Sequence, residues 1–217
     1  DVIPDSPSHQ RAREAMPVGG SVLDIGCGGG IAAFAVAPPA SVVVGVDHQQ
    51  AMLDMFASTA RQRHLEHLEF LGDWPAVADQ TPVVDVVTCH HVVYNVSEIE
   101  PFLLELDAHA TKRVVIEMPQ QHPLASRRNA WKQFWNIERP VDPTPEDLMA
   151  VLREIGIDAN LQLWQGSAPR TLPMDDEVRF LRIRLCLDSS KDAEVRAFIE
   201  SEPAPTHREL ATIWWDK

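Results

Sequence analysis

Three glycines and two aspartates are the residues whose types and spacing point most clearly to chemistry. Gly26, Gly28 and Gly30 follow a short apolar run that contains Asp24, and Asp47 comes seventeen residues after Gly30. Alternate glycines let a ligand rest against the backbone, and they accept positive φ angles. A carboxylate after the next strand can accept hydrogen bonds from the two hydroxyls of a ribose. The stretch therefore predicts a site for a nucleoside.

Two ligands use a glycine turn of this kind, and the glycine spacing discriminates between them. A dinucleotide fingerprint, G-x-G-x-x-G, read from Gly26 requires glycine or alanine at the position that Ile31 occupies. Read from Gly28, the fingerprint is formally satisfied, but its first glycine then lies two residues too late. The pattern acidic-x-Gly-x-Gly-x-Gly fits at every position from Asp24 to Gly30.

With this pattern the chain resembles the class I S-adenosylmethionine-dependent methyltransferases. The segments VLDIGCGGG (22–30) and VVVGVD (42–47) match the first and second motifs of that family, and the resemblance is specific over residues 21–118. It implies an α/β Rossmann-like domain, S-adenosylmethionine as cofactor, and methyl transfer to a small-molecule acceptor by in-line displacement. The attacking atom of the acceptor, oxygen, nitrogen or carbon, stays open. The alternatives are a non-catalytic S-adenosylmethionine-binding module and, with less support, an NAD(P)-dependent oxidoreductase.

The resemblance extends the cofactor site to two further strand ends. After the third expected strand, Asp73 can accept from an adenine amine while Trp74 covers the ring; an ordinary Gly-Asp turn with a half-buried tryptophan is the alternative. At the end of the fourth strand, Cys89 and His90 are expected to contact the cofactor. The predicted cofactor residues are Asp24, Gly26, Cys27, Gly28, Asp47, His48, Gly72, Asp73, Trp74, Cys89 and His90.

A general base is needed only where the acceptor is a hydroxyl or a protonated amine, and histidine has the side-chain pKa nearest to working pH. His91 is the first choice, His122 after the fifth strand the second, and Tyr94 the third. For each of them, shaping the pocket is the alternative. A metal is not expected, because His90 and His91 are adjacent and point to opposite sides, and no carboxylate lies at ligand spacing.

The elements that must position these residues alternate between strand and helix, which predicts a mostly parallel sheet with right-handed crossovers. Strands are expected over 22–25, 41–46, 68–71, 83–89, 112–119, 157–165 and 210–215. The resemblance makes the last of these the seventh, antiparallel strand. Helices are expected over 31–36, 49–67, 96–109, 144–154, 175–187 and 192–200, with helical spacing also in the aromatic residues of 120–137.

Local signals mark several of these boundaries. Ser97 and Glu100 match a capping box at one helix start, and Thr144 caps another. A helix as long as 49–67 would allow His64 and His67 to share one face, as part of a solvated surface.

The outer segments are the least like the family. Residues 1–20 are expected to be a leader or lid rather than a fold element, with only 8–16 able to form a helix. Arg11 and Arg13 in this segment either pair with a ligand carboxylate or are solvated surface residues.

Residues 119–143 and 166–200 are expected to be insertions on the acceptor side of the site. Trp131, Phe134 and Trp135 within the first insertion form either an apolar acceptor wall or the packed face of an inserted helix. Residues 169–173 are expected to be a loop.

Length, charge and cysteine content bound the class of protein. The 217 residues suit a single domain, residues 1–217. The formal net charge of −13 disfavours a phosphate-tracking surface, so nucleic-acid partners are not expected. The lack of a long apolar run and of a signal-peptide pattern favours a cytoplasmic protein with no membrane partner. Cys27, Cys89 and Cys186 are odd in number and far apart, which fits neither a disulfide framework nor a zinc site.

Overall fold

The structure of the protein is a computed structural model that describes residues 5–167, 172–202 and 205–217. The chain divides into two compact units. The first unit comprises Asp1–Gln120, Thr144–Trp164 and Leu210–Lys217, and the second comprises Gln121–Pro143 and Gln165–Glu209. The two ranges of the second unit overlap the two segments expected as insertions, 119–143 and 166–200.

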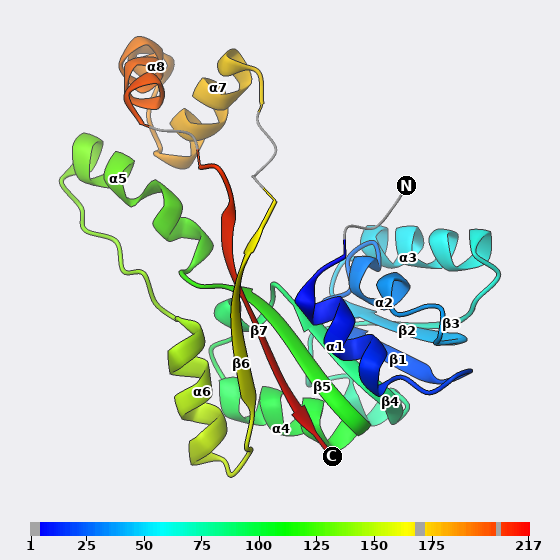
Figure 1. Cartoon of the computed structure of the whole chain (residues 1–217). Coiled ribbons are helices and arrows are strands. Elements are labelled where there is room, and N and C mark those ends of the chain that lie inside the picture. The colour runs from blue at the N-terminus through cyan, green and yellow to red at the C-terminus, as the bar shows by residue number, and fades with distance from the viewer. Residues whose placement is uncertain (1–4, 168–171, 203–204) are drawn as a thin grey trace. The chain divides into compact units, whose positions relative to one another are not determined.

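A seven-stranded sheet organises the fold (Figure 1). Its strands are β1 Ser21–Ile25, β2 Val42–Asp47, β3 Glu66–Leu71, β4 Val84–His90, β5 Ala110–Pro119, β6 Asn160–Gly166 and β7 Arg208–Asp216. The order across the sheet is β3-β2-β1-β4-β5-β7-β6. Strands β1 to β5 pair in parallel, and β7 pairs with β5 in the antiparallel sense. The expected mostly parallel sheet with an antiparallel seventh strand is confirmed.

Helices connect the strands. The α-helices are α1 Pro7–Ala15, α2 Ile31–Ala35, α3 Gln50–Gln62, α4 Ile99–His109, α5 Arg128–Trp135, α6 Pro145–Glu154, α7 Met174–Arg184 and α8 Asp192–Ser201. Short 3₁₀ helices are η1 Ala78–Gln80, η2 Val93–Asn95, η3 Pro123–Arg127 and η4 Ser189–Lys191. No described helix is both long enough and apolar enough to cross a membrane.

The central strands bury both of their faces, because successive side chains enter two different cores. On one face of the sheet, residues of α1, α2 and α3 pack with Val22, Val43, Val86 and Val115. On the other face, residues of α4 and α6 pack with Leu23, Val44, Val87 and Val114. Strands covered on both sides read as continuous apolar runs, which explains why the parallel sheet is visible in the sequence.

The expectation that residues 1–20 are not a fold element is wrong for the described part of this segment. Helix α1 packs against the sheet, and Ser8, His9 and Ala12 are buried. The Ser8 and Thr212 hydroxyls share a hydrogen bond of 2.6 Å, which ties α1 to β7. Residues 1–4 lie outside the described residues.

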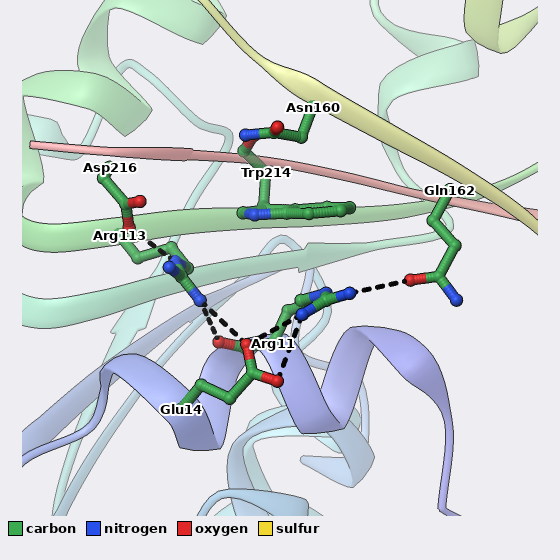
Figure 2. A network of polar contacts seen from close by, with 7 residues as sticks. All are labelled: Arg11, Glu14, Arg113, Asn160, Gln162, Trp214 and Asp216. Atoms are coloured by element: carbon green, nitrogen blue, oxygen red, sulfur yellow. Dashed lines mark hydrogen bonds and ion pairs between the residues drawn. The ribbon is translucent and has the colours of Figure 1, made fainter.

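Arg11 has partners within the first unit. Its guanidinium lies over the Trp214 ring, 4.5 Å from the centroid, and Figure 2 shows it reaching Glu14 and Gln162. Glu14 also accepts from Arg113 of β5 at 3.3 Å. Neither expectation for this arginine, a ligand contact or a freely solvated side chain, describes the observed placement.

Arg13 is likewise engaged by the protein. It donates to the Ala35 carbonyl at 2.9 Å, at the end of α2, and pairs with Asp5. The contact with Ala35 holds α1 against α2. Because Arg13 also pairs with Asp5, this placement does not support the expected pairing with a ligand carboxylate.

Two local expectations in the first unit are also wrong. Helix α3 ends at Gln62, so His64 lies in a left-handed turn (φ 56°) and His67 in β3, and the two do not share a helix face. Helix α4 starts at Ile99 with Glu98 as N-cap, and its cap has no side-chain hydrogen bond. The expected Ser97–Glu100 capping box is therefore absent.

The capping signal of α6 is confirmed. The Thr144 hydroxyl accepts from the Asp147 amide, and the Asp147 carboxylate accepts from the Thr144 amide at 2.8 Å. Capping boxes join residues three apart, so a real one can be recognised locally.

The second unit has its own small apolar core. The buried members come from α5, α7, α8 and the residue after α7: Ala130, Val178, Leu181, Leu185, Val195 and Phe198. Trp131 and Phe134 pack against this core, whereas Trp135 is 46% exposed and its indole donates to the Leu185 carbonyl at 2.8 Å. The packed-face interpretation is confirmed for Trp131 and Phe134. Of the loop expected over 169–173, residues 169–171 lie outside the described residues.

Candidate functional site

The candidate site lies in the first unit, at the carboxyl ends of the parallel strands. From β1 the chain proceeds outward through β2 and β3, and it returns to the other side of β1 with β4 and β5. The order therefore reverses between β1 and β4, and the crevice at such a point is where open α/β sheets bind ligands. The turn over 26–30 follows β1, Asp47 ends β2, and His90 ends β4.

The three alternate glycines of the turn are required for different structural reasons. A Cβ added at Gly26 would lie 2.4 Å from Val92, and one added at Gly30 would lie 2.3 Å from Phe34. At Gly28 (φ 51°) an added Cβ would have no described atom within 4 Å. Gly26 and Gly30 are thus required by the packing of the protein itself. Only Gly28 leaves open the space that a ligand on the turn would fill.

Asp47 is anchored to the same turn. Its two carboxylate oxygens accept from the amides of Gly28 and Gln49, each at 2.9 Å, and the residue is 7% exposed. A carboxylate oxygen can accept more than one hydrogen bond, so both oxygens retain capacity for hydroxyl donors. The neighbouring His48 is 63% exposed. The structure thus brings Asp47 and Gly28 together, as a ribose site at the turn requires.

Asp24 is buried and its oxygens are used by protein groups. One accepts from the Thr88 hydroxyl at 3.0 Å, and the other accepts from the Ala33 amide of α2 at 3.2 Å. Burial raises the pKa of Asp24 to about 7, against these two hydrogen bonds, which act to lower it. The carboxyl therefore joins β1, β4 and α2 beneath the turn.

The third strand end offers one exposed and one buried residue. Asp73 is exposed, whereas Trp74 is 9% exposed, donates from its indole to the Phe102 carbonyl at 3.3 Å, and packs edge-on to His109. A Cβ at Gly72 would lie 2.3 Å from Val77. These contacts match the alternative of a packing tryptophan, and the adenine role of Gly72, Asp73 and Trp74 stays a prediction.

The cysteines show no sign of a reactive or metal-binding role. Cys27 and Cys89 are buried, and burial raises the pKa of both thiols, so neither is a thiolate near neutral pH. Cys186 is exposed and belongs to the second unit. Within the described ranges, no group of three or more histidine, cysteine or acidic side chains is placed to hold a metal ion.

The two adjacent histidines at the end of β4 differ in their surroundings. His90 stacks on His9 of α1 with centroids 5.5 Å apart, and its Nε2 is buried without a described hydrogen-bond partner. Burial lowers the pKa of His90 to about 4, so its ring is neutral near pH 7. His91 has φ 62° and a side chain that is 39% exposed.

Glu117 is the site residue that sequence reasoning missed. It lies on β5 beside His90, is 7% exposed, and its Oε1 is 3.2 Å from the His91 Nε2. Burial acts to raise the pKa of Glu117, but the hydrogen bond from His91 and the neighbouring imidazoles outweigh it and lower the pKa to about 2. The available signal was an acidic residue inside the apolar run 114–118.

The other two candidate bases lie elsewhere. Tyr94 is in η2, shortly after β4, and burial raises its pKa. His122 belongs to the second unit, where it caps η3 by accepting from the Leu124 amide through Nδ1. His91 and Tyr94 share the first unit with the predicted cofactor residues, and His122 does not.

Comparison with known proteins gives a consistent result. A family model described as a methyltransferase domain matches residues 22–112. An uncharacterized protein of Haemophilus influenzae is 34% identical over 228 residues, covering 96% of this chain and 81% of that protein. A ubiquinone biosynthesis O-methyltransferase of Coxiella burnetii is 30% identical over 80 residues, covering 37% of this chain and about a third (34%) of that protein.

The fold is shared with solved structures. A magnesium protoporphyrin IX methyltransferase from Synechocystis PCC 6803, solved with bound SAH, superposes with a TM-score of 0.56 and 14% sequence identity. The superposition covers 95% of this chain and 83% of that one. At this level of identity, the likeness concerns the fold.

Proposed function

The chain belongs to the class I S-adenosylmethionine-dependent methyltransferases, and from this premise we propose that it transfers the methyl group of S-adenosylmethionine to a small-molecule acceptor. The observation that carries the proposal is the pairing of Gly28 with Asp47. Open space beside Gly28 and a carboxylate fixed on its amide are what a nucleoside lying across the turn requires.

The first unit supplies the residues that would hold the cofactor. We assign the ribose hydroxyls to Asp47, with His48 beside it, and the nucleoside and methionine portions to the turn from Gly26 to Gly30, above Asp24. We assign the adenine to Gly72 and Asp73, with Trp74 supporting this segment from the core. Cys89 and His90, which end β4, are proposed as further cofactor neighbours.

The bound cofactor supplies a sulfonium methyl group, whose carbon is attacked by the acceptor's electron pair as the carbon–sulfur bond breaks. The protein's contribution is to orient the acceptor, to exclude water and to move a proton. We propose His91 as the base, because it is partly exposed and contacts an ionised carboxylate. His122 and Tyr94 stay the second and third candidates, and Tyr94 shares the first unit with His91.

The acceptor is proposed to be a small molecule. The formal net charge of −13 does not favour a polyanionic partner such as a nucleic acid. Residues 119–143 and 166–200, which supply most of the second unit, are the proposed acceptor-side segments, since the family model ends at residue 112.

Titration calorimetry and turnover test this function. We expect S-adenosylmethionine and S-adenosylhomocysteine to bind and NADH not to bind; tight binding of NADH alone would favour the oxidoreductase. With a panel of phenols, carboxylic acids and amines, formation of S-adenosylhomocysteine is the expected readout. Binding without turnover across a broad panel would favour a non-catalytic module.

The base assignment has its own test. His91→Ala should reduce turnover of a hydroxyl acceptor by about 10²- to 10⁴-fold while cofactor affinity stays within about twofold. An unchanged rate would leave His91 as a pocket wall.

A further inference from the structure

The chain bends at His91 so that both its main chain and its side chain return to Glu117. Residues 90 and 117 are partners in the β4–β5 register, and the next amide, that of His91, donates to the Glu117 carbonyl at 2.8 Å. The side-chain contact between Nε2 and Oε1 is 3.2 Å. A left-handed residue that is not glycine is uncommon, and these two contacts account for its presence at φ 62°.

The Glu117 carboxylate is itself held in place. Its second oxygen, Oε2, accepts from the Ser6 hydroxyl at 3.1 Å. Ser6 is the N-cap of α1, and its Oγ also accepts from the His9 amide at 3.2 Å, which orients the hydroxyl toward Glu117. Both carboxylate oxygens thus contact protein donors, and Ser8 of α1 also acts on Glu117 as a side-chain donor. Helix α1 therefore forms part of the support of the site.

The chemistry of this contact decides which imidazole nitrogen carries the proton. An ionised carboxylate only accepts hydrogen bonds, and the pKa of Glu117 is far below neutral pH. The His91 Nε2 must therefore be the N–H. Among the described residues no other polar group is recorded in contact with the ring, which is 39% exposed. Nδ1 is left with a lone pair.

Resting on the proposed methyl transfer, we propose that Glu117 is a positioning residue that fixes His91 in the Nε2–H tautomer and makes Nδ1 the atom that takes the acceptor's proton. The acceptor's O–H or N–H proton moves to the Nδ1 lone pair, and the electron pair released on the acceptor forms the bond to the methyl carbon. The Nε2–H stays on the ring and continues to donate to Glu117, whose negative charge stabilises the imidazolium. Nδ1 then gives its proton to water.

His90, the residue before His91, cannot act as this base. His90 faces His9, without a described carboxylate on its ring nitrogens, and its buried Nε2 is shielded from an acceptor. The inference also narrows the substrate class: the acceptor carries a hydroxyl or a protonated nitrogen rather than a nucleophile that is already free.

Imidazole ¹⁵N NMR of the unliganded protein tests the tautomer without any acceptor. In two-bond ¹H–¹⁵N spectra, with the His91 signals assigned from a His91→Gln variant, we expect the neutral ring to carry its proton on Nε2 and none on Nδ1. The Nε2 proton should be visible through slowed exchange with water. A His91 ring with its proton on Nδ1 would overturn the proposal.

Variants then separate a positioning role from a structural one. In Glu117→Gln we expect the slowed Nε2 proton signal to be lost and kcat with a hydroxyl acceptor to fall about 10-fold or more, with KM and cofactor affinity within about twofold. Asp85→Asn is the matched control, because Asp85 accepts from Ser21 at the opposite end of β4; its His91 spectrum should equal that of the wild type.

An unchanged His91 signal in folded Glu117→Gln would overturn the proposal, as would an unchanged kcat. If this variant fails to fold, the wild-type tautomer measurement still decides. Failure of S-adenosylmethionine to bind the wild type would instead contradict the proposed function, whatever tautomer His91 adopts.

Discussion

The two units of the chain differ in where their polar side chains lie. Every described polar or charged residue that is buried belongs to the first unit, among them Asp24, Asp47 and Glu117. In the second unit the Arg196–Asp175 pair is exposed. The Arg182 Nε and Asp192 Oδ1 atoms, 2.8 Å apart, are buried, although neither residue is buried as a whole. A buried carboxylate needs dedicated partners, so its position is fixed by the fold. In the proposed function, the cofactor would be held by the first unit, where these buried carboxylates lie.

The largest effect is expected at the turn itself. Gly28→Ala should abolish measurable cofactor binding, a loss of about 100-fold or more, because its Cβ enters the space that the ligand needs. Gly19→Ala is the matched control, since Gly19 also has positive φ and no described atom near an added Cβ. Calorimetry with S-adenosylhomocysteine compares them. Equal affinities in the two variants would place the ligand elsewhere.

A second change tests whether the units are separable. Leu181→Ala, in the second unit, should destabilise that unit by about 2–5 kcal/mol through the cavity it leaves, and cofactor affinity should stay within about twofold. Leu23→Ala makes the same substitution at a fully buried site beside Asp24 in the first unit. Amide hydrogen exchange of α7 and of β1 reports the two losses. A 10-fold weaker cofactor affinity in Leu181→Ala would contradict the division of roles.

Protonation of His90 should reduce the stability of the first unit in acid. The pKa of His90 is about 4 in the folded chain and about 6.5 when unfolded. At this group the unfolded chain therefore binds more protons between these values, and the contribution of His90 to stability falls as the pH falls through that window, by about 3 kcal/mol in full. Asp24 acts in the opposite sense over an overlapping window, because its pKa is raised in the folded chain.

Urea unfolding at pH 7 and pH 4.5 measures this contribution. His90→Gln should make the change in stability between the two pH values less unfavourable than in the wild type. His207→Gln, at a partly exposed histidine of the second unit, should leave that change as in the wild type. The same loss in His90→Gln as in the wild type would refute the assignment.

The smallest effect concerns the ribose contact. Asp47→Ala should weaken cofactor affinity by about 1–3 kcal/mol, because it removes an acceptor for the hydroxyls and the anchor of the Gly28 amide. Asp85→Ala, which also loses two protein hydrogen bonds, should leave the affinity unchanged. Calorimetry distinguishes the two, and unchanged affinity in Asp47→Ala would contradict the ribose assignment.

Local sequence patterns made the parallel sheet and the glycine turn over residues 26–30 predictable. The apolar strands, the spaced glycines and the carboxylate after β2 are all read within a few residues, and the capping box of α6 is equally local. The sequence also revealed the helical spacing of Trp131 and Phe134, although not what they pack against.

The features that could not be predicted depend on contacts between distant residues. Glu117 meets His91 only through the register of β4 and β5, and Arg11 meets Trp214 only once α1 lies on the sheet. The end of α3 at Gln62 and the cap at Glu98 likewise have no distinctive signal in neighbouring residues. Helix α1 was not expected to be a fold element, because its buried face consists of Ser8, His9 and Ala12 rather than a stripe of large apolar residues.

A crystal structure with S-adenosylhomocysteine would show whether a nucleoside lies across the turn at Gly28 with its ribose on Asp47. We expect both ribose hydroxyls within hydrogen-bonding distance of the Asp47 carboxylate and the nucleoside in contact with Gly28. A nucleoside bound away from this turn, with Asp47 still occupied only by the Gly28 and Gln49 amides, would contradict it.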